Sequence, residues 1–254
     1  GERFGGGGAE DGRIPPRDGE EDFGRSRMGS IHETGHARYE RNRPRDWVQL
    51  PVGRARSMGI HESQSLSFEM QLGRSQAFVQ GLAPLLQKHL GAQPAFEADN
   101  LARLLTRVQP GLIRVDADEL TYPAHIILRF EIERALIDGA IAPADIPALW
   151  DEKMQAYLGL DTRGNFQDGC LQDIHWPSGS FGYFPSYTLG AMYAAQYFAS
   201  MRPQHADQDA RIACGDVSPV MDLLKRNIWS QASLWHTAAL VQRARVSGRT
   251  SLLP

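Results

Sequence analysis

The chain has 254 residues, of which 42% are hydrophobic and 22% charged, a composition typical of a globular protein with a sizeable core. Its formal net charge of -3 and the absence of a long run of Lys or Arg argue against nucleic-acid binding, which requires a basic face. The two cysteines, Cys170 and Cys214, are too few for a disulfide framework or a cysteine-based zinc site, so we expect a reducing, cytoplasmic setting.

The N-terminal part of the chain divides into a lead-in and a first helix. Residues 1–27 are rich in Gly, Arg and acidic residues, so we expect a loose segment without an apolar signal sequence. Apolar or small residues then recur at helical spacing at Met28, Ile31, Gly35 and Tyr39. This periodicity predicts one helix from Met28 onward.

The rest of the chain is also expected to be helical. Residues 58–90 predict one or two helices, with Pro84 at a kink or boundary. Further helices are expected over 94–108 and 125–139, after the cap Asp145, over 186–201 and from Ser218 onward. Residues 164–185 are dense in Gly and aromatic residues without a sustained period, which predicts a long ordered loop of the kind that usually serves a site. No stretch reaches the roughly 18 apolar residues of a membrane-spanning helix. The expected fold class is therefore mainly α, with at most a small β element near the site.

The strongest chemical signal is His32-Glu33-x-x-His36 in the first predicted helix. Residues four apart lie on one face of an α-helix, so both histidines can offer a ring nitrogen to one tetrahedral zinc about 2.0–2.1 Å away. Glu33 can then reach water bound at that metal and act as general base without being a ligand. Glu62, in the segment HESQS, is the best candidate for the third ligand. His61 is expected to be a neighbour of the site, because a fourth ligand would close the open position.

An HExxH string can arise by chance, but here several blocks run in the same order as in one known family. The chain resembles the carboxypeptidase Taq family of zinc carboxypeptidases over roughly residues 20–240, in the segments HETGHARYE, PVGRARSMGIHESQS, FEMQLGRSQAF, IRVDADELTYPAHIILRFEIE, GCLQDIHWPSGSFGYFPSYTLGAMYAAQ and NIWSQAS. The resemblance implies a helical, gluzincin-like peptidase that removes single residues from peptide C-termini with broad specificity, often as a homodimer.

The resemblance also assigns roles to residues. It implies that His32, His36 and Glu62 hold the metal and that Glu33 activates water and passes the proton to the leaving amine. Arg114, in the family's IRxxAD segment, would hold the terminal carboxylate of the substrate, a task that suits a guanidinium fork. His175, with Tyr183 or Tyr187, could donate hydrogen bonds to the carbonyl oxygen as it gains charge.

Several features depart from the family pattern. The family's chains are roughly twice as long, so we expect residues 28–254 to be the catalytic region, with the family's N-terminal half absent. The family's HPF motif is represented only by Glu2-Arg3-Phe4 and its DxRxT motif by Asp11-Gly12-Arg13-Ile14-Pro15. Pro15 would interrupt strand pairing. These features predict a truncated or degenerate copy.

Three hypotheses follow. The first is a zinc-dependent carboxypeptidase that acts on peptides with a free C-terminus; cobalt suits the same ligands. The second is a catalytically inactive remnant that binds metal or a partner chain through exposed apolar surface. The third is an endopeptidase of the same metal-site type, to which a carboxylate clamp at Arg114 would be of no use. Neither nucleic acid nor a membrane is expected as a partner.

Overall fold

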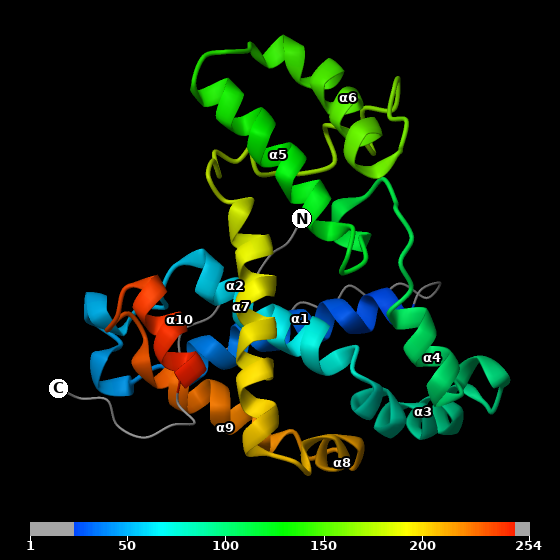
Figure 1. The fold of residues 1–254 in the computed structure, drawn as a ribbon, viewed down its shortest axis with the longest axis vertical. Coiled ribbons are helices and arrows are strands. Elements are labelled where there is room, and N and C mark those ends of the chain that lie inside the picture. Colours follow the sequence, from blue (N-terminus) through cyan, green and yellow to red (C-terminus); the bar gives the residue numbers. More distant parts are fainter. Residues whose placement is uncertain (1–22, 247–254) are drawn as a thin grey trace. The chain divides into compact units, whose positions relative to one another are not determined.

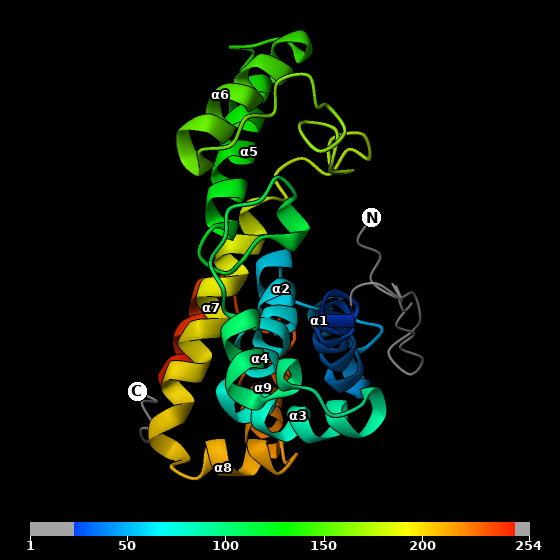
Figure 2. The ribbon, with the colours of Figure 1, turned by 90° about the vertical axis from the view of Figure 1, so that its right-hand side faces the viewer.

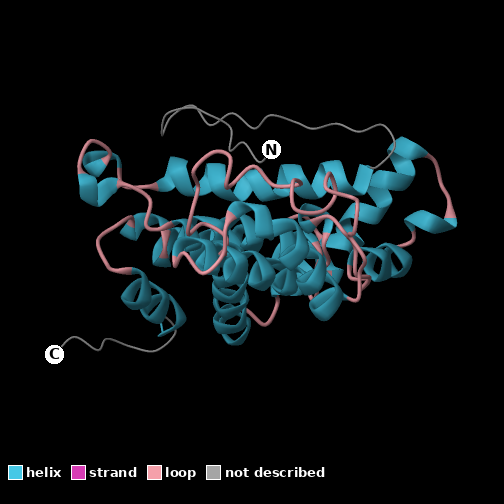
Figure 3. Cartoon of the chain, turned by 90° about the horizontal axis from the view of Figure 1, so that it is seen from above, coloured by secondary structure: helices cyan, strands magenta, loops and turns pink. Residues whose placement is uncertain are grey.

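The computed structural model describes residues 23–246, and this part of the chain is helical without a β-strand (Figure 3). The predicted mainly α fold is therefore confirmed, and the small β element is not found there. Most of the predicted lead-in, with the counterparts of the HPF and DxRxT motifs, lies outside the described residues. No helix described is both long and apolar enough to cross a membrane.

The described residues fall into two compact units, called here unit 1 (106–189) and unit 2 (23–105 and 190–246). Sequence analysis did not anticipate this division, whose second boundary lies inside helix α7. The α-helices are α1 (Phe23–Asn42), α2 (Met58–Leu66), α3 (Gln76–Leu90), α4 (Ala98–Leu105), α5 (Tyr122–Ile137), α6 (Ile146–Leu158), α7 (Pro185–Met201), α8 (Gln208–Ala213), α9 (Ser218–Asn227) and α10 (Thr237–Val246). A π-helix, η3 (Ser67–Gly73), follows α2. Short 3-10 helices are η1 (Arg45–Trp47), η2 (Pro51–Gly53), η4 (Pro94–Phe96), η5 (Arg114–Asp116), η6 (Pro143–Asp145), η7 (Arg202–Gln204) and η8 (Trp229–Gln231).

Helix α1 carries the HETGH segment and packs against α2 and η3 in unit 2. It begins at Phe23, earlier than the predicted Met28, and its predicted inner face is correct because Met28 and Tyr39 are both buried. Gly35 lies on the same face, where a Cβ atom would come within 2.4 Å of the carbonyl oxygen of Gln64. Only glycine therefore permits this approach of α1 to α2.

Residues 58–90 form three helical pieces, α2, η3 and α3. Ser75 caps the third piece, because its hydroxyl accepts a hydrogen bond from the backbone N–H of Phe78 at 3.2 Å. Of the kink or boundary predicted at Pro84, the boundary is wrong, since α3 continues through this residue. Proline removes the bond to the carbonyl of Gln80, but both residues are exposed and water can replace it.

The core of unit 2 joins segments that are far apart in the sequence. Ile60, Phe68, Tyr197 and Trp229 all belong to one buried apolar cluster. Helix α3 packs against α4 on one side and α8 on the other (Figures 1 and 2). The helix that carries Glu62 is therefore held from several directions.

Unit 1 is built on the helical hairpin of α5 and α6 (Figures 1 and 2). Leu128, Ile132, Trp150 and Met154 form its buried core. Tyr157 lies at the same helical spacing as Trp150 and Met154 but is 43% exposed. Residues 159–184 form no regular helix, as predicted for the long loop before α7.

Candidate active site

The structure brings His32, His36 and Glu62 together in unit 2. One ligand atom from each lies within 4.8 Å of the others. Nε2 of His32 is 3.5 Å from Oε1 of Glu62, and Nε2 of His36 is 3.6 Å from Oε2. The predicted spacing of two histidines on one helix and a carboxylate from a second helix is thus found.

This donor set fits a divalent metal ion such as zinc. Two imidazole nitrogens and one carboxylate are three protein ligands of the catalytic zinc type, with a position left open. Ligands about 2.0–2.1 Å from a tetrahedral zinc are roughly 3.4 Å from each other. The measured 3.5 and 3.6 Å separations agree with that value.

The electrostatics of this cluster favour a cation. Burial by itself lowers the pKa of His32, but the hydrogen bond to Glu69 and the charges of Glu62, Glu69 and Glu33 raise that pKa to about 10. Burial and the neighbouring histidines lower the pKa of His36 well below its usual value. Carboxylates that hold a proton this strongly also attract a metal ion.

Packing fixes the position of Glu62, which is 2% exposed. A Cβ atom on Gly190 of α7 would be only 2.8 Å from Cβ of Glu62, so glycine permits the close contact of the two helices. Gln64, two residues further, accepts a hydrogen bond from the indole N–H of Trp229 at 2.8 Å. The HESQS segment is therefore held rigidly on both sides.

Each histidine has a hydrogen-bonding partner on its other ring nitrogen. Nδ1 of His32 lies 2.9 Å from Oε2 of Glu69 on η3. Nδ1 of His36 lies 2.6 Å from Nδ1 of His61, so His61 is the neighbour of the site that the sequence predicted. Nε2 of His61 in turn lies 2.9 Å from Oε1 of Glu40.

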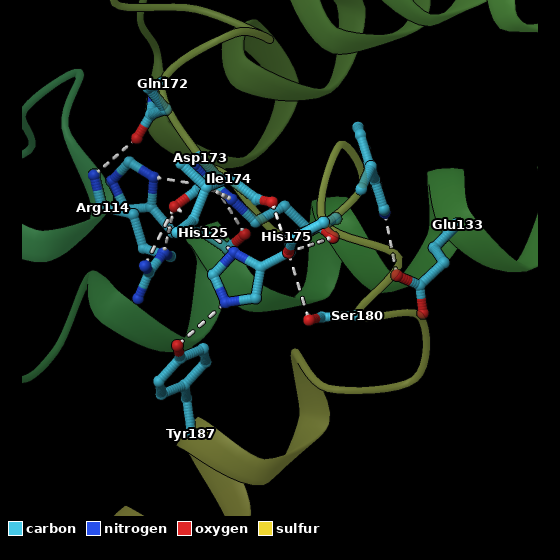
Figure 4. Close-up of polar contacts among 12 residues, drawn as sticks. Arg114, His125, Glu133, Gln172, Asp173, Ile174, His175, Ser180 and Tyr187 are labelled. Atoms are coloured by element: carbon cyan, nitrogen blue, oxygen red, sulfur yellow. Dashed lines mark hydrogen bonds and ion pairs between the residues drawn. The ribbon is translucent and has the colours of Figure 1, made fainter. Parts of the chain in front are cut away.

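Arg114, the predicted carboxylate clamp, lies in unit 1 and is 1% exposed. Its Nε and Nη2 donate to Oδ1 of Asp173 at 3.0 and 2.9 Å (Figure 4). Its Nη1 donates to the hydroxyl of Tyr122 at 3.0 Å. The guanidinium also lies 4.6 Å from the ring centroid of Tyr187. Arg114 therefore already has a structural partner set inside its own unit.

A second arginine shares the same carboxylate. Nε of Arg129 donates to Oδ2 of Asp173 at 2.6 Å, and its guanidinium lies 4.4 Å from the ring centroid of Trp150. Burial raises the pKa of Asp173, but the charges of Arg129 and Arg114 outweigh it and the pKa is lowered. Asp173 is therefore a buried carboxylate held ionised between two guanidinium groups.

The remaining predicted residues lie in the loop before α7 and at its start. Nε2 of His175 lies 2.9 Å from the hydroxyl of Tyr187, and both side chains are buried (Figure 4). The ring of Tyr183 lies 5.5 Å from that of His175 but is only half-buried. His175, Tyr183 and Tyr187 thus form one cluster, in which only Tyr183 reaches the surface.

Sequence reasoning missed the partners of the predicted residues. Glu69, Glu40 and Asp173 were not singled out, although each contacts a residue that was. One signal was available, because Glu69 lies seven positions after Glu62, close to two helical turns along the same face. Asp173 adjoins His175 in the quoted loop segment, but nothing local indicates that it contacts Arg114.

An HExxH helix with a carboxylate from a neighbouring helix, in an all-helical setting, is typical of helical metallopeptidases. The family model described as carboxypeptidase Taq (M32) metallopeptidase matches residues 4–251. The chain belongs to this family.

Individual relatives agree with this assignment. Thermostable carboxypeptidase 1 of Thermus thermophilus is 38% identical, with 93% of this chain and 46% of the relative covered, and carboxypeptidase 1 of Bacillus subtilis is 41% identical, with 85% and 43% covered. The solved structure of Trypanosoma cruzi metallocarboxypeptidase 1 is 49% identical and superimposes with a TM-score of 0.90 over 96% of this chain and 50% of that one. The chain thus spans about half the length of the relatives that it matches.

Proposed function

We propose that this chain provides the metal-binding part of a zinc-dependent carboxypeptidase that hydrolyses the C-terminal peptide bond of peptides with broad specificity. The convergence of His32, His36 and Glu62 within 4.8 Å is the observation that carries the proposal. These three residues would hold the zinc ion. Family membership and the names of the relatives support the reaction class.

When bound, zinc would supply Lewis-acid chemistry by polarising the scissile carbonyl and lowering the pKa of a water molecule. Glu33 follows His32 on α1, and its charge is one of those that raise the pKa of His32, so it lies within electrostatic reach of the site. We propose that Glu33 accepts the proton of the attacking water as the oxygen–carbon bond forms. Glu33 then gives this proton to the leaving amine as the carbon–nitrogen bond breaks.

The roles of the unit 1 residues remain predictions from the family resemblance. Of the two tyrosines proposed to stabilise the carbonyl oxygen, the half-buried Tyr183 is better supported than Tyr187, whose hydroxyl contacts His175. Arg114 has its donors turned to Asp173 and Tyr122. To clamp a substrate carboxylate it would have to exchange one of these partners.

Two measurements on the purified chain test the proposal. Metal content is determined by mass spectrometry, and release of free amino acids is followed from a peptide with a free C-terminus, before and after chelation. The same peptide with an amidated C-terminus is the control, because a carboxypeptidase requires the free carboxylate. We expect about one zinc ion per chain and chelator-sensitive release from the free peptide only.

The other outcomes separate the alternatives. Zinc binding without release supports the inactive remnant, and internal cleavage of the amidated peptide supports an endopeptidase. Cobalt in place of zinc would change the metal but not the reaction, since both suit these ligands. The predicted homodimer and cytoplasmic location are separate expectations, which size-exclusion chromatography and cell fractionation test.

A further inference from the structure

The two histidines of the candidate metal site each point one ring nitrogen at the site and the other at a hydrogen-bonding partner. Nε2 of both rings faces Glu62, at 3.5 and 3.6 Å. Nδ1 of His32 faces Glu69, and Nδ1 of His36 faces His61. A neutral imidazole carries one proton, so these partners decide which nitrogen keeps a lone pair.

The partner of His32 is a carboxylate in a fixed position. Glu69 lies on the π-helix η3, a type of helical turn that is frequent at functional sites. Its Oε1 accepts a hydrogen bond from Nη2 of Arg74 at 2.5 Å, while Oε2 faces His32. A carboxylate paired with an arginine can only accept, so Nδ1 of His32 must donate, and the neutral ring that binds a metal keeps its lone pair on Nε2.

The partner of His36 is a histidine whose own protonation is set by a second carboxylate. Glu40 is paired with Arg43, and its other oxygen lies 2.9 Å from Nε2 of His61. In its neutral form His61 therefore carries its proton on Nε2 and presents a lone pair at Nδ1. The 2.6 Å contact then requires Nδ1 of His36 to donate, which leaves the lone pair of His36 on Nε2 as well.

We propose that Glu69 and the His61–Glu40 pair are positioning residues, which hold His32 and His36 with both Nε2 lone pairs turned toward a divalent cation. The inference rests on the metal site of the proposed function, but not on hydrolysis. Both partners come from outside the HExxH motif, and both end in an Arg-paired carboxylate. Such outer partners fix the orientation and tautomer of ligating histidines in metal sites.

The first test is the affinity for Zn²⁺ alone, measured by competition with a chromophoric chelator. We expect Glu69→Ala and Glu40→Ala to weaken the affinity by about 10- to 100-fold. Glu69→Gln and Glu40→Gln keep an oxygen acceptor and should fall in between. Glu131→Gln is the matched control, because Glu131 is also a doubly hydrogen-bonded carboxylate but its partners are Lys153 and Tyr157. The zinc affinity of this variant should equal that of the unmodified chain.

The second test needs no variant. In the zinc-loaded chain, long-range ¹H–¹⁵N NMR spectra should show His32 and His36 protonated at Nδ1, and His61 protonated at Nε2. The signal of His61 discriminates, because zinc held through Nε2 by itself leaves the proton of His32 and His36 on Nδ1, whereas only the contact with Glu40 places the proton of His61 on Nε2. The measurement also holds if a variant fails to fold, which circular dichroism would reveal.

The outcomes separate this inference from the proposed function. Altered affinity and the expected tautomers without peptide hydrolysis support the positioning roles and contradict the enzyme. Unchanged affinity in the Ala variants, or a proton on Nε2 of His36 in the loaded chain, overturns the positioning roles alone. A chain that binds no zinc overturns both.

Discussion

The two polar centres of the molecule, one in each unit, are built on opposite principles. In unit 2 the converging groups are two imidazole rings and the carboxylate of Glu62, all of which can donate lone pairs to a cation. In unit 1 the converging groups are the cations Arg114 and Arg129, which share the single carboxylate of Asp173. A bound cation would stabilise the cluster in unit 2. The charges in unit 1 are already paired with one another, and the guanidinium groups lie against aromatic rings.

The difference shows that burial alone does not distinguish the two centres. Arg114 and Arg129 are more buried than His32, yet their donors are largely used inside the unit. Buried ion pairs of this kind contribute little when intact but are costly to break. The unit 2 cluster instead joins carboxylates and imidazole rings, which is the donor chemistry of a catalytic zinc site.

The largest effect is expected where the ion pairs of unit 1 are broken. Asp173→Asn leaves two buried guanidinium groups without their carboxylate, and we expect it to lower the free energy of unfolding by about 3–5 kcal/mol. Urea denaturation followed by circular dichroism measures this change. Asp161→Asn is the control, because Asp161 pairs with Arg163 on the exposed surface and should have little effect. Equal effects of both substitutions would mean that the buried pairs do not hold unit 1 together.

A second, smaller effect depends on pH. His125 is fully buried, and this burial, together with the charge of Arg129, lowers its pKa from 6.5 to about 4. Between these pH values His125 binds a proton in the unfolded chain but stays neutral in the folded chain. The stability that neutral His125 contributes is therefore complete above pH 6.5 and is lost as the pH falls toward 4, on the order of 3 kcal/mol in total.

This pH dependence can be measured in the presence of a chelator, so that metal loss does not contribute. The free energy of unfolding of His125→Gln should fall less steeply between pH 6.5 and 4 than that of the unmodified chain. His89→Gln, at an exposed position of α3, should leave the slope unchanged. An NMR titration that places the pKa of His125 near 6.5 would contradict this prediction, because folding would then leave the proton affinity of His125 unchanged.

The same contrast explains what the sequence could predict. The HExxH spacing is local, so the face of α1 and the pairing of His32 with His36 follow from helical periodicity. The ion pairs of unit 1 depend on tertiary contacts, since Arg114 and Asp173 are 59 positions apart. No periodicity encodes such a contact, so the partners that Arg114 has inside unit 1 could not be predicted from the sequence.

The helix boundaries likewise depend partly on local signals and partly on tertiary packing. Caps such as Ser75 act within one turn and leave a local signal, whereas Pro84, predicted to mark a kink or boundary, lies inside α3. The proline is tolerated because its side of α3 is exposed, which only the packed structure determines. Likewise Tyr157 fits the apolar period of α6, but the hairpin with α5 does not cover it.

The smallest expected effect concerns Gly35, which the apolar pattern included without giving a reason for glycine. The Cβ atom of Gly35→Ala would lie 2.4 Å from the carbonyl oxygen of Gln64, so α1 and α2 must move apart and His36 must move away from Glu62. We expect a loss of about 1–3 kcal/mol in unfolding free energy and a fall in zinc affinity of roughly 10-fold. Gly29→Ala, on the same helix with no atom within 4 Å of its Cβ, should instead stabilise the chain by about 0.5–1 kcal/mol. The two Gly→Ala substitutions on one helix should thus change the unfolding free energy in opposite directions. Changes in the same direction would show that the close approach of α1 to α2 does not set the geometry of the metal site.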